Sequence, residues 1–366
     1  MMCVAKITSP DDPALEELCA QLADMARELD VSGEWPARQL ALCGEHGVFE
    51  WFLEPEWGGQ AWDDEAVVRG YMALSSACLT TTFIITQRTG ACRRIASSVQ
   101  RGPQALLLPD LVSGKTMATV GISHLTTSRR HLARPILCAE SVAGGFVLDG
   151  FTPWVTGAAQ SDFVVVGATM TVGDEVTSEQ VLVALPTDLP GLIAAVPAQL
   201  VGLSASHTGE LRLKSVFVED RWVLAGPVEN VMAVGFGAGA GGYQTSTLAL
   251  GLARSAIDFL ESQIAQRSEL TPPFEALERE FQEVNQQLLA VVRGEPDCSG
   301  EQLRQHANSL VLRCTQAALV AAKGTGYVLG HPAGRWCREA LFFLVWSCPQ
   351  PVSSANLCEL AGIAHN

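Results

Sequence analysis

The sequence is poor in charged residues, and it contains no paired-cysteine motif. Only 17% of its 366 residues are charged while 48% are hydrophobic, a composition typical of a compact globular protein. The 24 Lys and Arg against 39 Asp and Glu give a formal net charge of −15. Because this charge repels phosphate backbones, we expect no nucleic-acid partner.

The 11 cysteines include no C-x-x-C pair, and an odd count in a long chain predicts reduced thiols in a cytoplasmic protein. The histidines show no ligand spacing, so we predict no metal site. The longest apolar run, residues 71–86, is interrupted by Ser and Thr and is too short to span a bilayer. No apolar signal-peptide segment follows Met1 before Asp11, so the predicted location is the cytoplasm, without a membrane span.

The hydrophobic pattern changes twice along the chain. Residues 12–110 show helical spacing, residues 117–219 contain short β-branched segments separated by glycines, and helical spacing returns from Val231. The pattern predicts an α+β fold with an N-terminal helical domain (1–112), a central antiparallel β-barrel or sandwich (113–225) and a C-terminal four-helix bundle (226–366). The fourth bundle helix is expected to start at 340–346.

Three short motifs stand at the ends of apolar runs or between helices: Pro55–Gly59, Gly121–His124 and Trp154–Gly157. A fourth, Gly237–Gly242, satisfies G-x-G-x-x-G before a strong helical pattern. A Rossmann unit would also need a second strand and an acidic residue after that helix. Because Pro272-Pro273 and another helical pattern follow instead, we interpret these glycines as the entry into a bundle helix.

The helical–β–helical order and the motifs resemble the acyl-CoA dehydrogenase superfamily of FAD-dependent flavoproteins over nearly the whole chain. The Pro55–Gly59 turn is similar to the family's Gly-Gly loop, Gly121–His124 to its flavin loop, and Trp154–Gly157 to its tryptophan-containing strand. Two-electron flavin chemistry changes the charge on the ring, so fixed hydroxyl and N–H donors suit it. The resemblance implies an FAD site that includes Ile122, Ser123, Trp154 and Thr156.

The resemblance also implies that bundle residues contact the FAD of a neighbouring subunit. A homodimer or homotetramer is therefore expected. The residues at the corresponding positions are Arg267, Phe274, Gln282, Gly324 and Gly326.

The family's catalytic glutamate has no counterpart here. Its two possible places fall on Ser347 and Gly241, and neither residue can remove a proton as a carboxylate does. His124 is a candidate acid or base near neutral pH, and Gln87 and Arg88 are candidate pocket residues. Cys348 would be nucleophilic only with a lowered pKa.

A basic pair, Arg129 and Arg130, follows the flavin loop. In the family this loop lies near the CoA entrance, so the pair is predicted to bind substrate phosphates.

We predict an FAD-dependent oxidoreductase acting on an acyl thioester, such as a CoA thioester, or on a similar small organic substrate, with Ser347 in place of the usual base. Two alternatives stay open. One is a flavin-dependent monooxygenase of the same fold, supplied with electrons by a reductase partner. The other is a catalytically silent family member that serves as an interaction scaffold.

Overall fold

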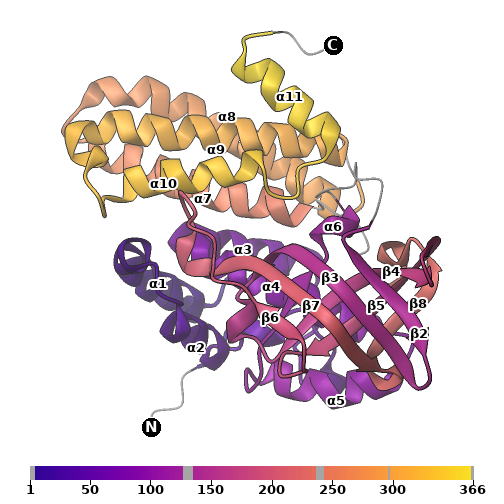
Figure 1. The fold of residues 1–366 in the computed structure, drawn as a ribbon. Coiled ribbons are helices and arrows are strands. Elements are labelled where there is room, and N and C mark those ends of the chain that lie inside the picture. Colours follow the sequence, from indigo (N-terminus) through magenta and orange to yellow (C-terminus); the bar gives the residue numbers. More distant parts are fainter. Residues whose placement is uncertain (1–4, 127–134, 236–242, 296, 364–366) are drawn as a thin grey trace.

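The computed structural model describes residues 5–126, 135–235, 243–295 and 297–363 (Figure 1). The helical–β–helical order predicted from the sequence is confirmed. The N-terminal helices are α1 (Pro13–Ser32), α2 (Ala37–Glu45), α3 (Asp64–Ala77), α4 (Leu79–Ala96) and α5 (Arg101–Val112). The strands are β1 (Ala118–Gly121), β2 (Leu137–Val142), β3 (Gly145–Thr156), β4 (Phe163–Val172), β5 (Glu175–Pro186), β6 (Leu192–Ala194), β7 (Thr208–Glu219) and β8 (Val223–Glu229). The later helices are α7 (Tyr243–Ile264), α8 (Thr271–Val292), α9 (Gly300–Ala322), α10 (Pro332–Ala340) and α11 (Gln350–Leu360), and a short helix α6 (Ser123–Thr126) follows β1.

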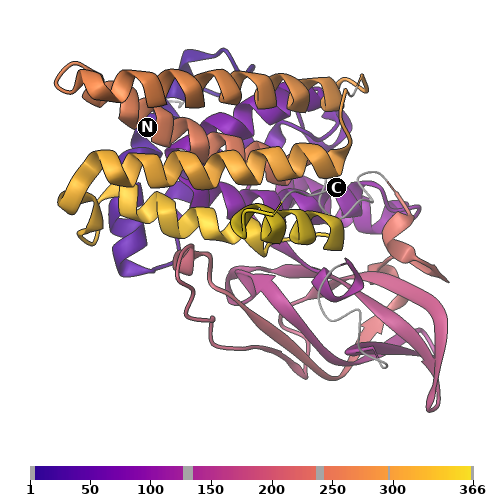
Figure 2. The same ribbon diagram turned by 90° about the horizontal axis from the view of Figure 1, so that it is seen from above.

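Helix α4 is largely buried and contributes to three hydrophobic clusters. Ala91 and Ile95 belong to the cluster under the sheet, Phe83 to that of the bundle, and Ile84 and Ile85 to that of the N-terminal helices. Figure 1 shows α4 behind the sheet, and Figure 2 shows the purple N-terminal helices behind the bundle. Helix α4 packs against β1 on one side and α7 on another. Buried residues on several faces of one helix are typical of a helix in the interior of a protein.

The strands form one mixed sheet, in the order β6-β7-β3-β2-β4-β5-β8, with β1 also paired to β4. The prediction of an antiparallel domain needs one correction, because β1 and β2 both run parallel to β4. They follow one another along the same edge: Ala118–Gly121 pair with Phe163–Val166, and Cys138–Glu140 pair with Thr169–Thr171. The pattern of short apolar segments in the sequence predicts strands but not whether two strands pair parallel or antiparallel. Strand β8 continues to Glu229, past the predicted domain boundary at residue 225.

The boundaries of the bundle helices depend on local features of the sequence, and one of them was predicted wrongly. Pro272 and Pro273 occupy the first turn of α8, where the missing proline N–H has no helical partner to lose, so they begin this helix. The predicted start of a fourth helix at 340–346 is wrong: α10 ends at Ala340 and a 3₁₀ turn, Leu341–Leu344, follows it. No helix in the described ranges is long and apolar enough to cross a membrane.

Candidate active site

A cavity of about 810 Å³ lies between α4, the ends of β1 and β3, and the segment after α10. Its volume falls within the range of about 300–1,000 Å³ common for small-molecule sites. Four residues predicted to hold a flavin line it: Ile122, Ser123, Trp154 and Thr156. Ser347, at the predicted base position, lines it as well. The structure thus brings two distant motifs and the C-terminal loop to one cavity.

The turn after β1 depends on a close approach of three strands. A Cβ atom on Gly121 would lie 2.9 Å from the Thr152 side chain and 3.1 Å from that of Val155, so a larger residue would push β1 away from β3. Ser123 then begins the short helix α6. Its Oγ is buried and has no hydrogen-bond partner among the described residues, which leaves a donor and acceptor available to a ligand.

Trp154 faces the cavity because of an irregularity in β3. Between Thr152 and Val155 the pairing with β7 shifts by one residue, from Leu211 to Gly209, at the place where Pro153 provides no N–H. Such a bulge redirects side chains. Trp154 is 50% exposed and lines the cavity together with Thr156, two residues further along the strand. An exposed indole of this kind can cover one face of a flat ligand.

The hydroxyl of Thr156 belongs to a short chain of hydrogen bonds. Its Oγ1 lies 3.0 Å from Oγ1 of Thr208, which lies 2.9 Å from Oγ of Ser206. All three residues are buried. Because either partner of each contact can donate, the chain holds the Thr156 side chain in one orientation and still leaves its hydroxyl adaptable to a ligand.

His124 does not line the cavity. Its Nε2 lies 2.8 Å from the carbonyl oxygen of Gly167 and so donates to it, in the stretch of β4 between the segments paired with β1 and β2. Burial lowers the pKa of the imidazole, and the Gly167 contact opposes this. The neutral ring therefore provides a hydrogen-bond donor to a β4 carbonyl that neither β1 nor β2 pairs with. His124 thus has a structural role and does not contact a substrate in the cavity.

A buried arginine, Arg304, donates hydrogen bonds to the backbone just before Ser347. Arg304 donates to the carbonyl oxygens of Phe343 and Trp346, at 3.3 Å and 2.8 Å, and to Asn308. Burial lowers the pKa of Arg304 to about 10. Ser347 itself has φ 45°, a left-handed conformation unusual for a non-glycine residue. Burial raises the pKa of the adjacent Cys348 thiol, with Arg304 opposing, so an activated thiolate is not favoured there.

Gln87 lines the cavity, whereas Arg88 does not. The Arg88 guanidinium lies over the Phe49 ring, 3.9 Å from its centre, and donates to the Leu111 carbonyl. Arg129, Arg130 and Gly241 lie outside the described residues, as does the whole Gly237–Gly242 motif. Their predicted roles stay predictions.

The five bundle residues predicted to contact FAD do not line the cavity. Arg267 donates to the Ala321 carbonyl at 2.6 Å, which ties it to the end of α9 just before Gly324 and Gly326. Phe274 is half-buried and Gln282 is exposed, where it donates to Glu278. Among the described residues these five are thus outside the cavity of their own chain.

Sequence reasoning missed several polar residues at the cavity, among them Asp64, Arg93, Arg94 and Tyr243. Asp64 Oδ1 lies 3.4 Å from an Arg93 nitrogen. Burial raises the pKa of Tyr243 and the Asp64 charge adds to this, while Arg93 opposes it. One signal was available, since Gln87, Gly90 and Arg94 follow at spacings of three and four along α4 and so share a face.

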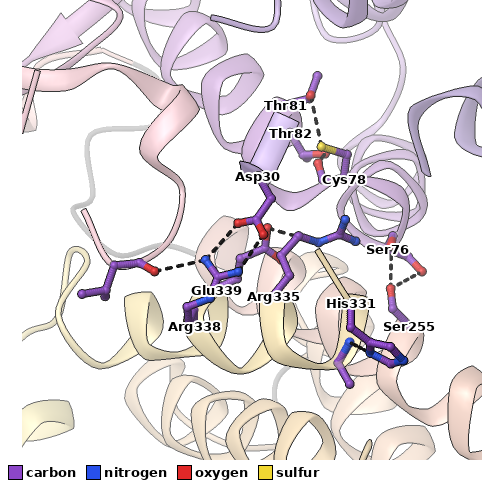
Figure 3. Close-up of polar contacts among 12 residues, drawn as sticks. Asp30, Ser76, Cys78, Thr81, Thr82, Ser255, His331, Arg335, Arg338 and Glu339 are labelled. Carbon is purple, nitrogen blue, oxygen red and sulfur yellow. Dashed lines mark hydrogen bonds and ion pairs between the residues drawn. The ribbon is translucent and has the colours of Figure 1, made fainter. Parts of the chain in front are cut away.

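Another residue that lines the cavity, Arg338, forms a bidentate ion pair with Asp30. Arg338 binds both carboxylate oxygens of Asp30, at 2.9 Å and 2.6 Å, and donates to the Val201 carbonyl (Figure 3). The pair raises the pKa of Arg338. It joins α10 to α1, so the guanidinium charge is neutralised within the protein. No group of three or more potential metal ligands occurs among the residues that the structure describes.

Comparisons with known proteins show which proteins the chain is similar to. The chain is 24% identical over 344 residues to the probable acyl-CoA dehydrogenase YngJ of Bacillus subtilis, covering 87% of this chain and 88% of that protein. It is 23% identical over 375 residues to the glutaryl-CoA dehydrogenase of Desulfococcus multivorans, covering 93% and 91%. The chain is a homologue of the acyl-CoA dehydrogenases. No protein-family model matches it.

The acyl-CoA dehydrogenase fold is also found by comparison with solved structures. A glutaryl-CoA dehydrogenase from Mycobacterium smegmatis in complex with FADH2 has a TM-score of 0.78 at 15% identity, over 97% of this chain and 96% of that one. A dibenzothiophene monooxygenase, TdsC, from a Paenibacillus species has a TM-score of 0.76 at 15% identity, over 94% and 95%. At such identities the likeness establishes the fold alone, and it confirms the fold class predicted from the sequence.

Proposed function

We propose that the protein is an FAD-dependent oxidoreductase of the acyl-CoA dehydrogenase type that oxidises an acyl thioester or a similar small organic substrate in this cavity. The observation that carries the proposal is the convergence on one cavity of Ser123, Trp154 and Thr156 from the sheet with the Ser347 loop from the opposite side. Homology to acyl-CoA dehydrogenases over most of the chain supports the same reaction class.

The cavity residues fit a flavin. Ser123 offers a buried hydroxyl that has no partner among the described residues, Thr156 offers a second hydroxyl, and Trp154 offers an exposed aromatic face. When bound, FAD would accept the two electrons removed from the substrate. Ser123 and Thr156 would then supply the fixed donors that stabilise charge on the ring.

We propose that Arg267, Phe274, Gln282, Gly324 and Gly326 complete the FAD site of a second copy of the chain. Their position outside their own cavity supports this assignment. The exposed side chains of Val320, Tyr327, Val328 and Leu329 surround the same loop, and an apolar surface of this kind is typical of a subunit interface. A homodimer or homotetramer in sedimentation experiments is the expected result, and a monomer would contradict it.

A substitute for the missing glutamate is available at the cavity. Asp64 is the only carboxylate among the described residues that line it. We propose that Asp64 accepts the α proton of the substrate, because removal of that proton requires a positioned base. The neighbouring Arg93, 3.4 Å from Asp64 Oδ1, would hold the carboxylate in place. Glu65, the next residue, instead binds Arg293 and does not line the cavity, so it provides a matched control.

A monooxygenase reaction is the second candidate. The absence of a carboxylate at Ser347 favours it, since a reaction that begins with oxygen and reduced flavin needs no α-proton abstraction. This reading would require electrons from a separate reductase.

Spectroscopy and rapid mixing test both candidates. The purified protein should show visible flavin absorbance, alone or after reconstitution with FAD. A colourless protein that cannot be reconstituted would contradict both and favour a scaffold role. Bleaching by acyl-CoA thioesters without NAD(P)H supports dehydrogenation, while an oxygen-dependent product that forms only after reduction by a reductase supports the monooxygenase.

Three variants sharpen the dehydrogenase test. Asp64→Asn should slow bleaching by about 100-fold or more, the usual contribution of a positioned base, while Glu65→Gln should leave it unchanged. Ser347→Glu should increase bleaching if the rest of the site is intact. Wild-type bleaching rates in Asp64→Asn would exclude Asp64 as the base.

A further inference from the structure

Arg94 is a buried cation without a partner. It lies in the last turn of α4, is 8% exposed and lines the cavity. No hydrogen bond or ion pair joins its guanidinium to any described residue. The residues outside the described ranges include no Asp or Glu, so no side-chain carboxylate of the chain is left to pair with it.

The other two guanidinium groups at the cavity are neutralised within the protein. Arg93 pairs with Asp64, and Arg338 pairs with Asp30. Arg94 therefore leaves one uncompensated positive charge on a wall that is otherwise mainly apolar. Burial lowers the pKa of Arg94, and no charged neighbour opposes this. Proteins seldom keep an arginine buried and unpaired, because its desolvation is costly unless an anion compensates it.

We propose that the substrate carries a carboxylate group that pairs with Arg94 at the end of the cavity. This inference rests on the proposed function and adds the chemical class of the substrate: an acyl group with a second, anionic terminus. One free guanidinium matches a single carboxylate in charge and in bidentate geometry, whereas a phosphate dianion would need further donors.

The position of Arg94 separates this contact from the C-terminal loop. Phe83, in the first turns of α4, contacts Phe342 and Trp346, whose ring centres lie 4.8 Å and 5.1 Å from its own. Arg94 lies eleven residues later, roughly 16 Å further along the helix axis at 1.5 Å per residue. Between them, Gly90 presents no side chain to the cavity. The anionic terminus would thus lie far from Ser347.

Calorimetric titration of the purified full-length protein tests the assignment. The probes are pairs of CoA thioesters of equal chain length, one ending in a carboxylate and one in a methyl group, and CoA alone. Wild type should bind the carboxylate member of at least one pair about tenfold more tightly or better, the usual effect of a hydrogen-bonded charged group. Arg94→Met should lose this preference, and Arg94→Lys should keep part of it. Arg101→Met, at an exposed arginine on α5 that pairs with Glu56, is the control and should bind like wild type.

Urea unfolding without ligand distinguishes a binding role from a structural one. Removing an unpaired buried charge should leave Arg94→Met at least as stable as wild type. A clear loss of stability would mean that Arg94 supports the fold, and would overturn the proposal. Three binding results would also overturn it. Wild type could bind both probes of every pair equally, or Arg94→Met could keep the preference for the carboxylate. Weaker binding of CoA alone by Arg94→Met would indicate a phosphate contact instead. Calorimetry requires no turnover, so a colourless protein that prefers carboxylates contradicts only the flavin proposal. A flavin-containing protein without the preference contradicts only this one.

Discussion

The buried carboxyl group of Glu339 should make the stability of the protein depend on pH. Glu339 lies on α10 and is 3% exposed, with Arg335 Nε 3.7 Å from its Oε1 (Figure 3). Burial raises its pKa from 4.5 to about 7, and the Arg335 charge only partly opposes this. In the unfolded chain the carboxyl group ionises near pH 4.5, whereas in the folded protein it holds its proton up to about pH 7. Its contribution to stability is therefore fully present below pH 4.5 and is lost as the pH rises through 7.

The magnitude follows from the shift. At 1.36 kcal/mol per pKa unit, the change from 4.5 to about 7 corresponds to about 3 kcal/mol. Glu339→Gln removes the titration but keeps the size of the side chain. Relative to wild type, this variant should gain about 3 kcal/mol in free energy of unfolding between pH 4.5 and pH 8.

Urea unfolding at fixed protein concentration, repeated across this pH range, measures the difference. Other titrating groups affect wild type and variant alike, so the difference isolates Glu339. The exposed Glu17, on α1, provides the control: Glu17→Gln should follow the wild-type pH profile. A constant difference between Glu339→Gln and wild type at all pH values would refute the reasoning, because it would mean that the carboxyl group ionises equally in the folded and unfolded chains.

Three further predictions concern the supports of the cavity. His124→Leu should lower the free energy of unfolding by about 1–3 kcal/mol in urea titrations, because the buried Gly167 carbonyl loses its donor; an unchanged midpoint would contradict this. Arg304→Lys keeps the charge but cannot reproduce the guanidinium bonds to two carbonyls, so amide hydrogen exchange at Trp346 and Ser347 should accelerate, and equal rates would show that the loop does not need them. Thr208→Val should cost about 1 kcal/mol and shift the visible spectrum of the flavin-bound protein, since Thr156 loses its partner; a spectrum identical to that of wild type would argue against a Thr156 contact.

The sequence predicted the parts of the site that short motifs encode. Ser123, Trp154 and Thr156 were placed together by resemblance, and the structure brings them to one cavity with Ser347. Asp64, Arg94 and Tyr243 were missed because they come from α3, α4 and α7, and only the packing of these helices makes them converge. No local pattern encodes that contact.

The sheet shows the same limit. Alternating apolar segments predicted strands, but the parallel course of β1 and β2 depends on how the chain returns to β4. The structural role of His124 depends on this arrangement, because β1 and β2 pair with β4 on either side of Gly167. Sequence alone offered a titratable ring beside a flavin motif, whereas the position between two paired segments makes its Nε2 a donor to the backbone.

The shared use of α4 by three hydrophobic clusters has a consequence for how the protein unfolds. Chains of this length commonly lose their domains one after another, because each domain has a core of its own. Here α4 contributes side chains to the cores of the sheet, the bundle and the N-terminal helices. None of the three parts can therefore unfold without exposing apolar side chains of the other two. Unfolding should therefore be cooperative across the three parts, and the amides of α4 should exchange only through that global opening. A ligand bound along α4 would then protect the whole chain, even far from the atoms it touches.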